Sequence, residues 1–188
     1  IIESGGDLTL RNITMKFNEL TVNSGGRLKI ENSKNSIIHN DNFTISGTTY
    51  INNTAHYMNG SSDGEVGIKV TSTGSLYIIN NSNITNGASV DGGNASAHFF
   101  FWVESGANFS MNDSHLSECG FNGSENEKGL FIQTDKVSII NNTIANNYIG
   151  IYFDSSDNNT IANNTISNSS YGIYLYSSGS PPNHIYNN

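Results

Sequence analysis

The C-terminal part of the chain repeats itself with a period of 22 residues. The segment Asn141–Ile144 returns as Asn163–Ile166, and Gly150–Phe153 returns, with one conservative change, as Gly172–Leu175. A fixed period of this length is typical of a solenoid, in which each unit is too small to bury a core alone and stacks on its neighbours. The repeat therefore predicts the architecture of the chain.

Each repeat is predicted to be a coil of short β-strands. Ile151 and Phe153 alternate with Tyr152, which is the period of a strand, and no window shows helical spacing. Asn and Gly are expected at the corners, where stacked Asn amides bond from coil to coil. The predicted inward columns are Ile139 over Ile161, Ile144 over Ile166, Ile149 over Tyr171, Ile151 over Ile173 and Phe153 over Leu175.

The N-terminal part carries a looser form of the same pattern. Small turn residues followed by an alternating strand recur at 5–10, 25–30, 73–78 and 106–111, and residues 44–51 are expected to form a further coil. Residues 129–188 are thus predicted to be regular 22-residue repeats, and residues 1–128 irregular coils with loop insertions near 55–66, 86–97 and 117–128. The whole is predicted to be one all-β parallel solenoid of about eight to nine coils.

The two ends of the sequence carry an expectation of their own. The match of Asn183–Asn188 to Asn159–Asn164 stops within a repeat, and neither end has an evident polar cap. We expect the chain to be part of a longer protein, or its ends to pair with other subunits. The first residues lack the features of a signal peptide, so any targeting segment is expected outside this sequence.

The repeat resembles a known family. The motif Asn-Asn-Thr-Ile-x-Asn-Asn, followed by Gly-Ile-Tyr-Phe/Leu, is similar to the right-handed parallel β-helix repeat of NosD-like proteins and of large archaeal surface and adhesin-like proteins, most closely over residues 129–188. The resemblance implies the right-handed fold. It implies no single activity, because similar repeats occur in lyases, epimerases, glycosidases, tailspikes and surface-layer proteins. The copper-site maturation linked to NosD-like members has no metal-binding residues that map onto this chain.

Composition excludes some partners. The formal net charge is −8 and the arginines are Arg11 and Arg27, so no basic stripe is present to neutralise a nucleic-acid backbone. No apolar stretch approaches the roughly 18 residues of a membrane span. The single cysteine, Cys119, excludes internal disulfides and is expected to be a small buried residue.

Glycosylation sequons are unusually frequent. The chain has 31 asparagines and 14 Asn-x-Ser/Thr sequons, about twice the number expected by chance. Those at Asn141, Asn158 and Asn163 recur with the repeat and count for less. The remaining ones favour an exported, glycosylated chain. The predicted N-glycosylation sites are Asn12, Asn42, Asn52, Asn59, Asn80, Asn83, Asn94, Asn108, Asn112, Asn122 and Asn168.

Residues for catalysis are few. Sugar-cleaving chemistry requires two carboxylates at a set separation, or a base with charge neutralisation. Asp154 and Asp157 follow a strand, but they are replaced by Tyr176 and Gly179 in the next repeat, and a turn explains them. No two histidines have metal-ligand spacing along the chain, although a site assembled across coils stays open. No catalytic residue, metal or cofactor is therefore predicted.

Two aromatic features form a candidate interaction surface. Tyr152 and Tyr174 fall in one outward column, which would bind sugars, pack against a neighbour, or simply reflect the preference of tyrosine for strands. The run 98–103 cannot direct every side chain inward, so one alternate set must be covered by an insertion or by another subunit. The candidate surface consists of Phe99, Phe100, Phe101, Trp102, Tyr152 and Tyr174.

Two functions are consistent with these features. The first is an extracellular, N-glycosylated structural protein of a cell-surface layer, sheath, filament or adhesin, with self-association or neighbouring surface subunits as partners. The second is a carbohydrate-active enzyme, such as a lyase, hydrolase or epimerase, or a carbohydrate-binding module on the same fold. Visible N-glycans would favour the first, and an open groove with paired acidic residues the second.

Overall fold

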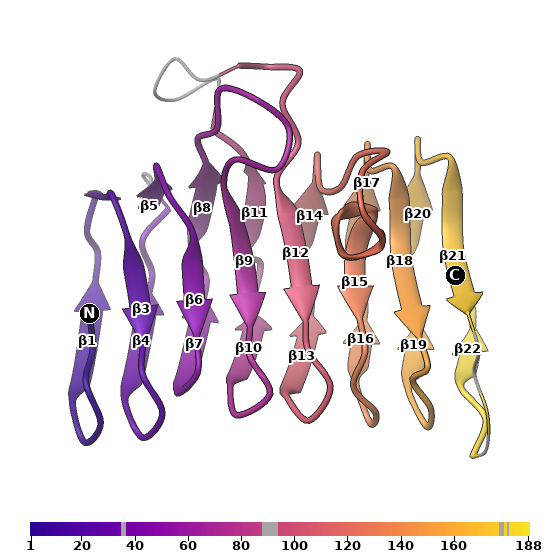
Figure 1. Cartoon of the computed structure of the whole chain (residues 1–188), viewed down its shortest axis with the longest axis horizontal. Coiled ribbons are helices and arrows are strands. Elements are labelled where there is room, and N and C mark those ends of the chain that lie inside the picture. The colour runs from indigo at the N-terminus through magenta and orange to yellow at the C-terminus, as the bar shows by residue number, and fades with distance from the viewer. Residues whose placement is uncertain (35–36, 88–93, 177–178, 180) are drawn as a thin grey trace.

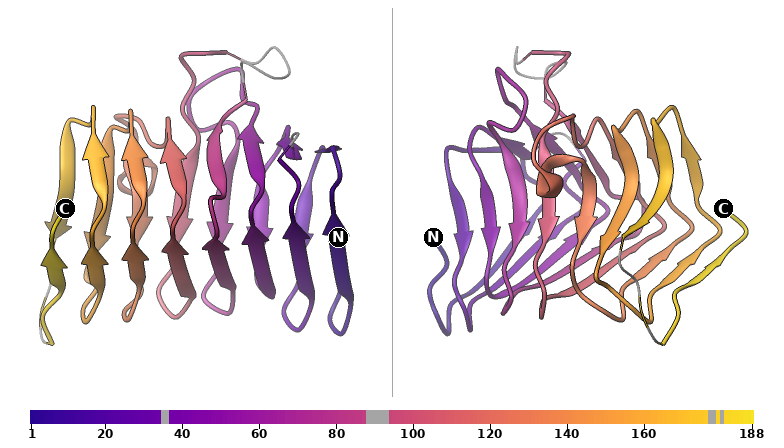
Figure 2. Two further views of the ribbon diagram at one scale, coloured as in Figure 1. Left: turned by 180° about the vertical axis from the view of Figure 1, so that it is seen from behind. Right: turned by 45° about the vertical axis from the view of Figure 1, so that its right-hand side comes forward.

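The chain forms three parallel β-sheets that share one interior (Figure 1). The computed structural model describes residues 1–34, 37–87, 94–176, 179 and 181–188. Successive strands enter the three sheets in turn, so each coil adds one strand to each sheet. The coils stack along the long axis of the molecule, as the two further views in Figure 2 show. This is the predicted all-β parallel solenoid.

The strands of each sheet follow one another in chain order. The first sheet consists of β1 (Asp7–Arg11), β4 (Arg27–Glu31), β7 (Thr48–Asn52), β10 (Ser75–Ile79), β13 (Asn108–Asn112), β16 (Ser138–Ile140), β19 (Thr160–Ala162) and β22 (His184–Tyr186). The second consists of β2 (Met15–Phe17), β5 (Ile37–His39), β8 (Ala55–Met58), β11 (Asn83–Asn86), β14 (His115–Ser117), β17 (Thr143–Ala145) and β20 (Thr165–Ser167). The third consists of β3 (Leu20–Val22), β6 (Phe43–Ile45), β9 (Gly67–Val70), β12 (Phe100–Val103), β15 (Gly129–Ile132), β18 (Ile149–Asp154) and β21 (Tyr171–Tyr176).

Strand register confirms four of the five predicted inward columns. Ile139 pairs with Ile161, Ile144 with Ile166, and Ile151 with Ile173. Side chains alternate across the sheets, so these residues fill the interior while their chain neighbours face outward. The expected extra coil at 44–51 is also present, as strands β6 and β7. All three sheets continue across residue 128, where the regular repeats begin.

The fifth predicted inward column, Ile149 over Tyr171, was wrong. A β-bulge shifts the register between Ile149 and Ile151, Ile149 packs on the outer face with Phe131 and Tyr152, and Tyr171 is 55% exposed.

A buried asparagine ladder holds the corner between the first and second sheets. The Asn142 side chain accepts a hydrogen bond from the Ser114 amide (3.0 Å) and donates one to the Met111 carbonyl (2.8 Å). The Asn142 backbone amide in turn donates to the Asn164 side-chain oxygen (2.9 Å), and the Asn164 side chain donates to Asn188 (2.8 Å). The strands leave backbone amide and carbonyl groups unpaired at the corner, and the asparagine side chains of the next coil form hydrogen bonds with them.

The residues next to the ladder turn the chain. Asn12, Asn32, Asn53, Asn141 and Asn163 occupy this corner with φ between 51° and 59°, and the two coils between Asn53 and Asn141 have Asn80, Asn81 and Asp113 there with φ between 51° and 60°. Asparagine tolerates this left-handed conformation better than other residues with a side chain. The abundance of asparagine in the sequence thus has a structural origin at the corners.

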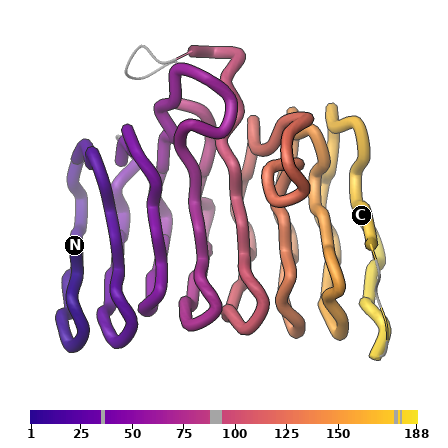
Figure 3. The backbone as a smooth tube through the Cα atoms, viewed as in Figure 1, coloured from indigo at the N-terminus to yellow at the C-terminus, as the bar shows by residue number. Residues whose placement is uncertain are grey.

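The insertions leave the solenoid at one edge, as the backbone trace in Figure 3 shows. The loops that follow β8 and β11 contact each other there, since the Asn94 side chain donates to the Ser61 carbonyl (3.2 Å) and the His98 amide to Asp63 (2.8 Å). The 86–97 insertion lies partly outside the described residues. The third insertion contains the short 3-10 helix η1 (Glu125–Glu127), which lies against β12 and β15 (Figure 1). In the described ranges, no helix is long and apolar enough to cross a membrane.

Candidate functional site

One outward column of the third sheet is aromatic. Register aligns Lys69, Trp102, Phe131, Tyr152 and Tyr174 across five neighbouring strands. The Lys69 ammonium lies 4.2 Å from the centre of the Trp102 ring, and the rings of Tyr152 and Tyr174 meet edge to face at 5.0 Å. Such contacts stabilise the face of a sheet without a second layer of strands.

The third insertion and the neighbouring strands cover part of this column. Phe131 and Tyr152 are 2% and 3% exposed, whereas Tyr174 is 38% exposed. The helix η1 lies against the strands that carry Trp102 and Phe131. An insertion of the chain itself therefore covers part of the outward aromatic side chains. This is one of the two predicted alternatives, the other being a cover provided by another subunit.

Three residues predicted as interaction surface are corrected by their burial. Phe99 and Phe101 point inward and are 3% and 0% exposed, because the strand alternates and these two occupy its inner positions. Tyr152 faces outward as predicted, but it packs in a cluster with Phe131 and Ile149 and is buried, so its ring is not accessible. Phe100 and Trp102 are half-buried, and Tyr174 remains exposed.

A tyrosine-lined cleft lies beside Tyr174. Its volume is about 250 Å³. Burial, followed by the nearby carboxylates of Glu125 and Asp154, raises the pKa of Tyr152 to about 12, so its hydroxyl stays protonated. The cleft is lined by Glu125, Lys128, Tyr148, Ile149, Tyr152, Tyr171, Tyr174 and Tyr176.

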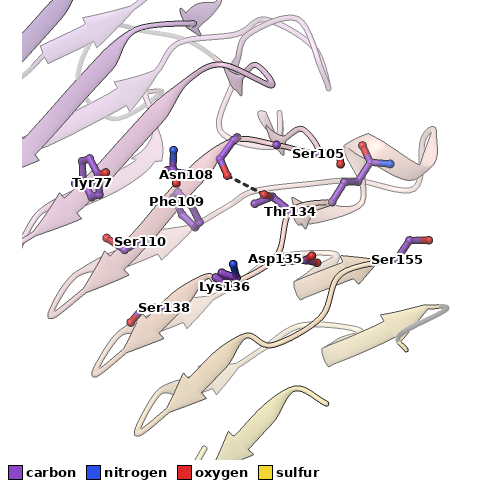
Figure 4. Close-up of a pocket in the computed structure, with 13 residues that line it drawn as sticks. Tyr77, Ser105, Asn108, Phe109, Ser110, Thr134, Asp135, Lys136, Ser138 and Ser155 are labelled. Atoms are coloured by element: carbon purple, nitrogen blue, oxygen red, sulfur yellow. Dashed lines mark hydrogen bonds between the residues drawn. The ribbon is translucent and has the colours of Figure 1, made fainter. Parts of the chain in front are cut away.

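A second, larger cleft lies on the outer face of the first sheet. It has a volume of about 570 Å³ and runs over β13 and β16 toward the turn between β15 and β16. Figure 4 shows Tyr77, Ser110 and Ser138 projecting from three successive strands, with Asn108 and Lys136 beside them. Its walls combine one aromatic ring with hydroxyl, amide and charged groups, which are the groups that bind sugars or other polar ligands.

A comparison with protein-family models identifies the architecture. The model for the right-handed β-helix region matches residues 43–188. The chain belongs to this right-handed β-helix family. No curated protein and no solved structure matches the chain. The narrower resemblance to NosD-like and archaeal surface proteins stays a prediction, and the family includes both enzymes and non-enzymes.

The turn aspartates of this β-helix have structural roles. Asp135 accepts the amide of Asp157 at 2.8 Å, and Asp157 accepts the amide of Gly179 at 2.5 Å, which forms an acidic ladder at the corner between the third and first sheets. Asp154 accepts from the Gln133 side chain (3.0 Å). Among the described residues, no three of His, Cys, Asp and Glu come together as a metal site.

Sequence reasoning missed a buried pair of histidines. His39 Nε2 and His56 Nδ1 lie 2.9 Å apart, and both side chains are fully buried. The pair is stacked against aromatic rings, with Phe43 5.2 Å and Phe17 5.7 Å from His39 between ring centres. The signal was the separation of 17 residues, close to one coil, which places the two in neighbouring turns of the solenoid.

Burial shifts the ionisation of these groups. The pKa of His39 is lowered to about 3 because burial disfavours the imidazolium, and burial followed by His39 holds the pKa of His56 well below its ordinary value. Both rings are therefore neutral at pH 7. Cys119 is buried as predicted, and burial raises the pKa of its thiol, which leaves it unreactive.

The β-helix sorts the predicted glycosylation sites by exposure. Asn42 and Asn83 are half-buried and their side-chain oxygens are buried, which leaves less room around the side-chain nitrogen that a glycan would modify. The half-buried asparagines are Asn42, Asn52, Asn59, Asn83 and Asn112. The exposed asparagines are Asn12, Asn80, Asn94, Asn108, Asn122 and Asn168.

Proposed function

We propose that this β-helix is an extracellular, N-glycosylated structural segment of a cell-surface layer, sheath, filament or adhesin. The observation that carries the proposal is the exposure of six sequon asparagines on the outside of the solenoid. Two of them, Asn80 and Asn168, also donate to an asparagine of the neighbouring coil. Glycans attach at exposed asparagines without disturbing such a frame, and they solubilise and shield it.

The mechanics of the frame support the same function. The coils are joined by continuous parallel sheets and by side-chain ladders at the corners, so load along the long axis is distributed over many hydrogen bonds. In solenoids, each repeat contacts mainly its neighbours, and an extended side surface remains for partners. Copies of this chain or neighbouring surface subunits are the proposed partners.

Glycopeptide mapping of the chain secreted from a glycosylating host tests the proposal. Glycans are expected at exposed sequons such as Asn94 and Asn122, with lower occupancy at Asn42 and Asn83, because these two side chains are half-buried. Comparison of the intact mass before and after enzymatic deglycosylation gives the total mass of attached glycan. A chain that carries no glycan at any site would contradict the proposal.

A carbohydrate-binding role is the second candidate, and the tyrosine-lined cleft favours it. Tyr171 and Tyr174 are 55% and 38% exposed, and the cleft also holds the carboxylate of Glu125 and the ammonium of Lys128. Exposed aromatic rings with nearby charged hydrogen-bonding groups are suited to the apolar faces and hydroxyls of sugars.

Titration of the unglycosylated chain with neutral and uronate hexasaccharides tests this second role. Tyr174→Ala is expected to weaken the binding of a hexasaccharide about five- to tenfold, because it removes roughly 1 kcal/mol of stacking. Tyr50→Ala, on the first sheet, serves as the matched control and leaves that affinity unchanged. Absence of binding by the whole panel, or equal loss in both variants, would contradict the role.

A further inference from the structure

The sequon at Asn108 opens onto the larger cleft. Both Asn108 and Ser110, the two defining residues of the sequon, line this cleft together with Tyr77. Asn108 is exposed, and its side-chain nitrogen donates a weak hydrogen bond to Ser75 on β10, at 3.3 Å. The atom that would carry a glycan therefore already leans toward the strand that carries Tyr77 (Figure 4).

Register brings Tyr77 within reach of that glycan. Ser75 pairs with Asn108 and Tyr77 pairs with Ser110, so Tyr77 lies one strand across and two residues along from Asn108. With strands about 4.8 Å apart and a rise of about 3.3 Å per residue, the two Cα atoms are separated by about 8 Å. A pyranose ring linked to Asn108 spans that distance along the sheet face.

An aromatic stack ends at Tyr77 and leaves one ring face free. Tyr50 and Tyr77 are stacked with centres 4.9 Å apart and planes inclined by 19°, and Arg27 lies 5.3 Å from the Tyr50 ring centre on the preceding strand. The next positions in the column are Ser110 and Ser138, which are too small to continue the stack. The cleft occupies the space where further rings would lie.

The rest of the cleft offers hydrogen-bonding groups at the periphery of that space. Ser110 and Ser138 place hydroxyl groups along its floor, and Asp135 and Lys136 stand at the turn between β15 and β16. The orientation of Asp135 is set by its hydrogen bond with the Asp157 amide (2.8 Å). A chair-shaped ring with an apolar C–H face and hydroxyl groups around its edge, which is the character of a pyranose, matches this arrangement.

We infer that a glycan on Asn108 folds back into this cleft and stacks its first pyranose ring on Tyr77, so that the sugar becomes part of the outer face of the first sheet. The inference rests on the proposed N-glycosylation and adds a defined seat for one glycan. The sugar ring continues the column that Tyr50 and Tyr77 begin. Its stacking on Tyr77 stabilises the folded chain.

A double-mutant cycle on the secreted, glycosylated chain tests the inference. Ser110→Ala abolishes the sequon without changing Asn108, and Tyr77→Thr removes the ring while keeping a strand-forming residue. Because Ser110 and Tyr77 are paired across the strands, the same cycle is also measured on chains made without glycosylation, where the coupling is expected to vanish. Tyr77→Thr is expected to lower Tm by about 2–4 °C more in the chain glycosylated at Asn108 than in the Ser110→Ala background. Ser96→Ala, which removes the distant sequon at Asn94, is the matched control and leaves this coupling intact.

The outcomes separate the inference from the proposed function. Equal Tm losses in the two backgrounds, or a chain glycosylated elsewhere but never at Asn108, would overturn the inference alone. A chain without any glycan would overturn the proposed function as well. Should Tyr77→Thr fail to fold, nuclear Overhauser contacts between the Tyr77 ring and sugar protons in the wild-type glycoprotein support the inference, and their absence overturns it.

Discussion

Acidification from pH 7 to pH 4 is expected to lower the free energy of unfolding by about 3 kcal/mol through His39 alone. The pKa of His39 is about 3 in the folded chain, against an ordinary value of about 6.5 in the unfolded chain. Between these values the unfolded chain binds the proton and the folded chain does not. The stability is therefore fully present above pH 6.5 and is lost as the pH falls toward 3, and His56 acts in the same direction.

Urea unfolding at several pH values between 7 and 4 measures this loss. The variant His39→Leu/His56→Leu places an apolar side chain of similar size at each site. It removes both titrating groups, together with two buried ring nitrogens that have no hydrogen-bond partner among the described residues. Its stability is expected to depend much less on pH. His184→Gln, on the exposed strand β22, is the matched control and keeps the wild-type slope. A steep pH slope in the double variant would contradict the assignment to the buried pair.

Asn142→Ala is expected to lower the free energy of unfolding by about 3–5 kcal/mol. The Asn142 side chain is 2% exposed, accepts from the Ser114 amide and donates to the Met111 carbonyl and to Asn164. Alanine makes none of these bonds, and each buried polar group that loses its partner costs about 1–3 kcal/mol. Urea denaturation, with the slope of the transition compared between variants, measures the change.

The adjacent Asn141 provides the matched control. Its side chain is exposed, its φ is 59°, and its side-chain nitrogen donates a hydrogen bond to Asp113 at 3.1 Å. Asn141→Gly keeps the left-handed backbone accessible and is expected to cost less than about 1 kcal/mol. Similar losses in Asn141→Gly and Asn142→Ala would mean that burial in the ladder is not the source of stability.

Much of the solenoid was predictable because the repeat relates residues that are only 22 positions apart in the sequence. The pairs Ile139 with Ile161 and Ile144 with Ile166 follow from the 22-residue period, since residues one coil apart must stack. The alternation of Ile151, Tyr152 and Phe153 likewise follows from strand geometry. The ladder at Asn142 and Asn164 was predictable for the same reason.

The candidate sites were less predictable because they depend on coils of unequal length. Tyr152 faces outward by alternation, but its burial depends on Tyr174, Phe131 and the aromatic cluster around it. Phe99 and Phe101 were placed in a candidate surface because the sequence does not say which alternate set of an all-aromatic run is inward. Register across the insertions decided that question.

The sequence by itself determined the solenoid, its strand period, four of the five predicted inward columns of the regular repeats and the use of asparagine at corners and in ladders. Each of these follows from a fixed spacing that stacks like residues on one another. Only the tertiary structure decided which sequons are exposed, that His39 meets His56 in the interior, and that Tyr77 ends a stack beside Asn108. These depend on side chains from different coils, whose alignment is set by loop lengths and register and not by the repeat.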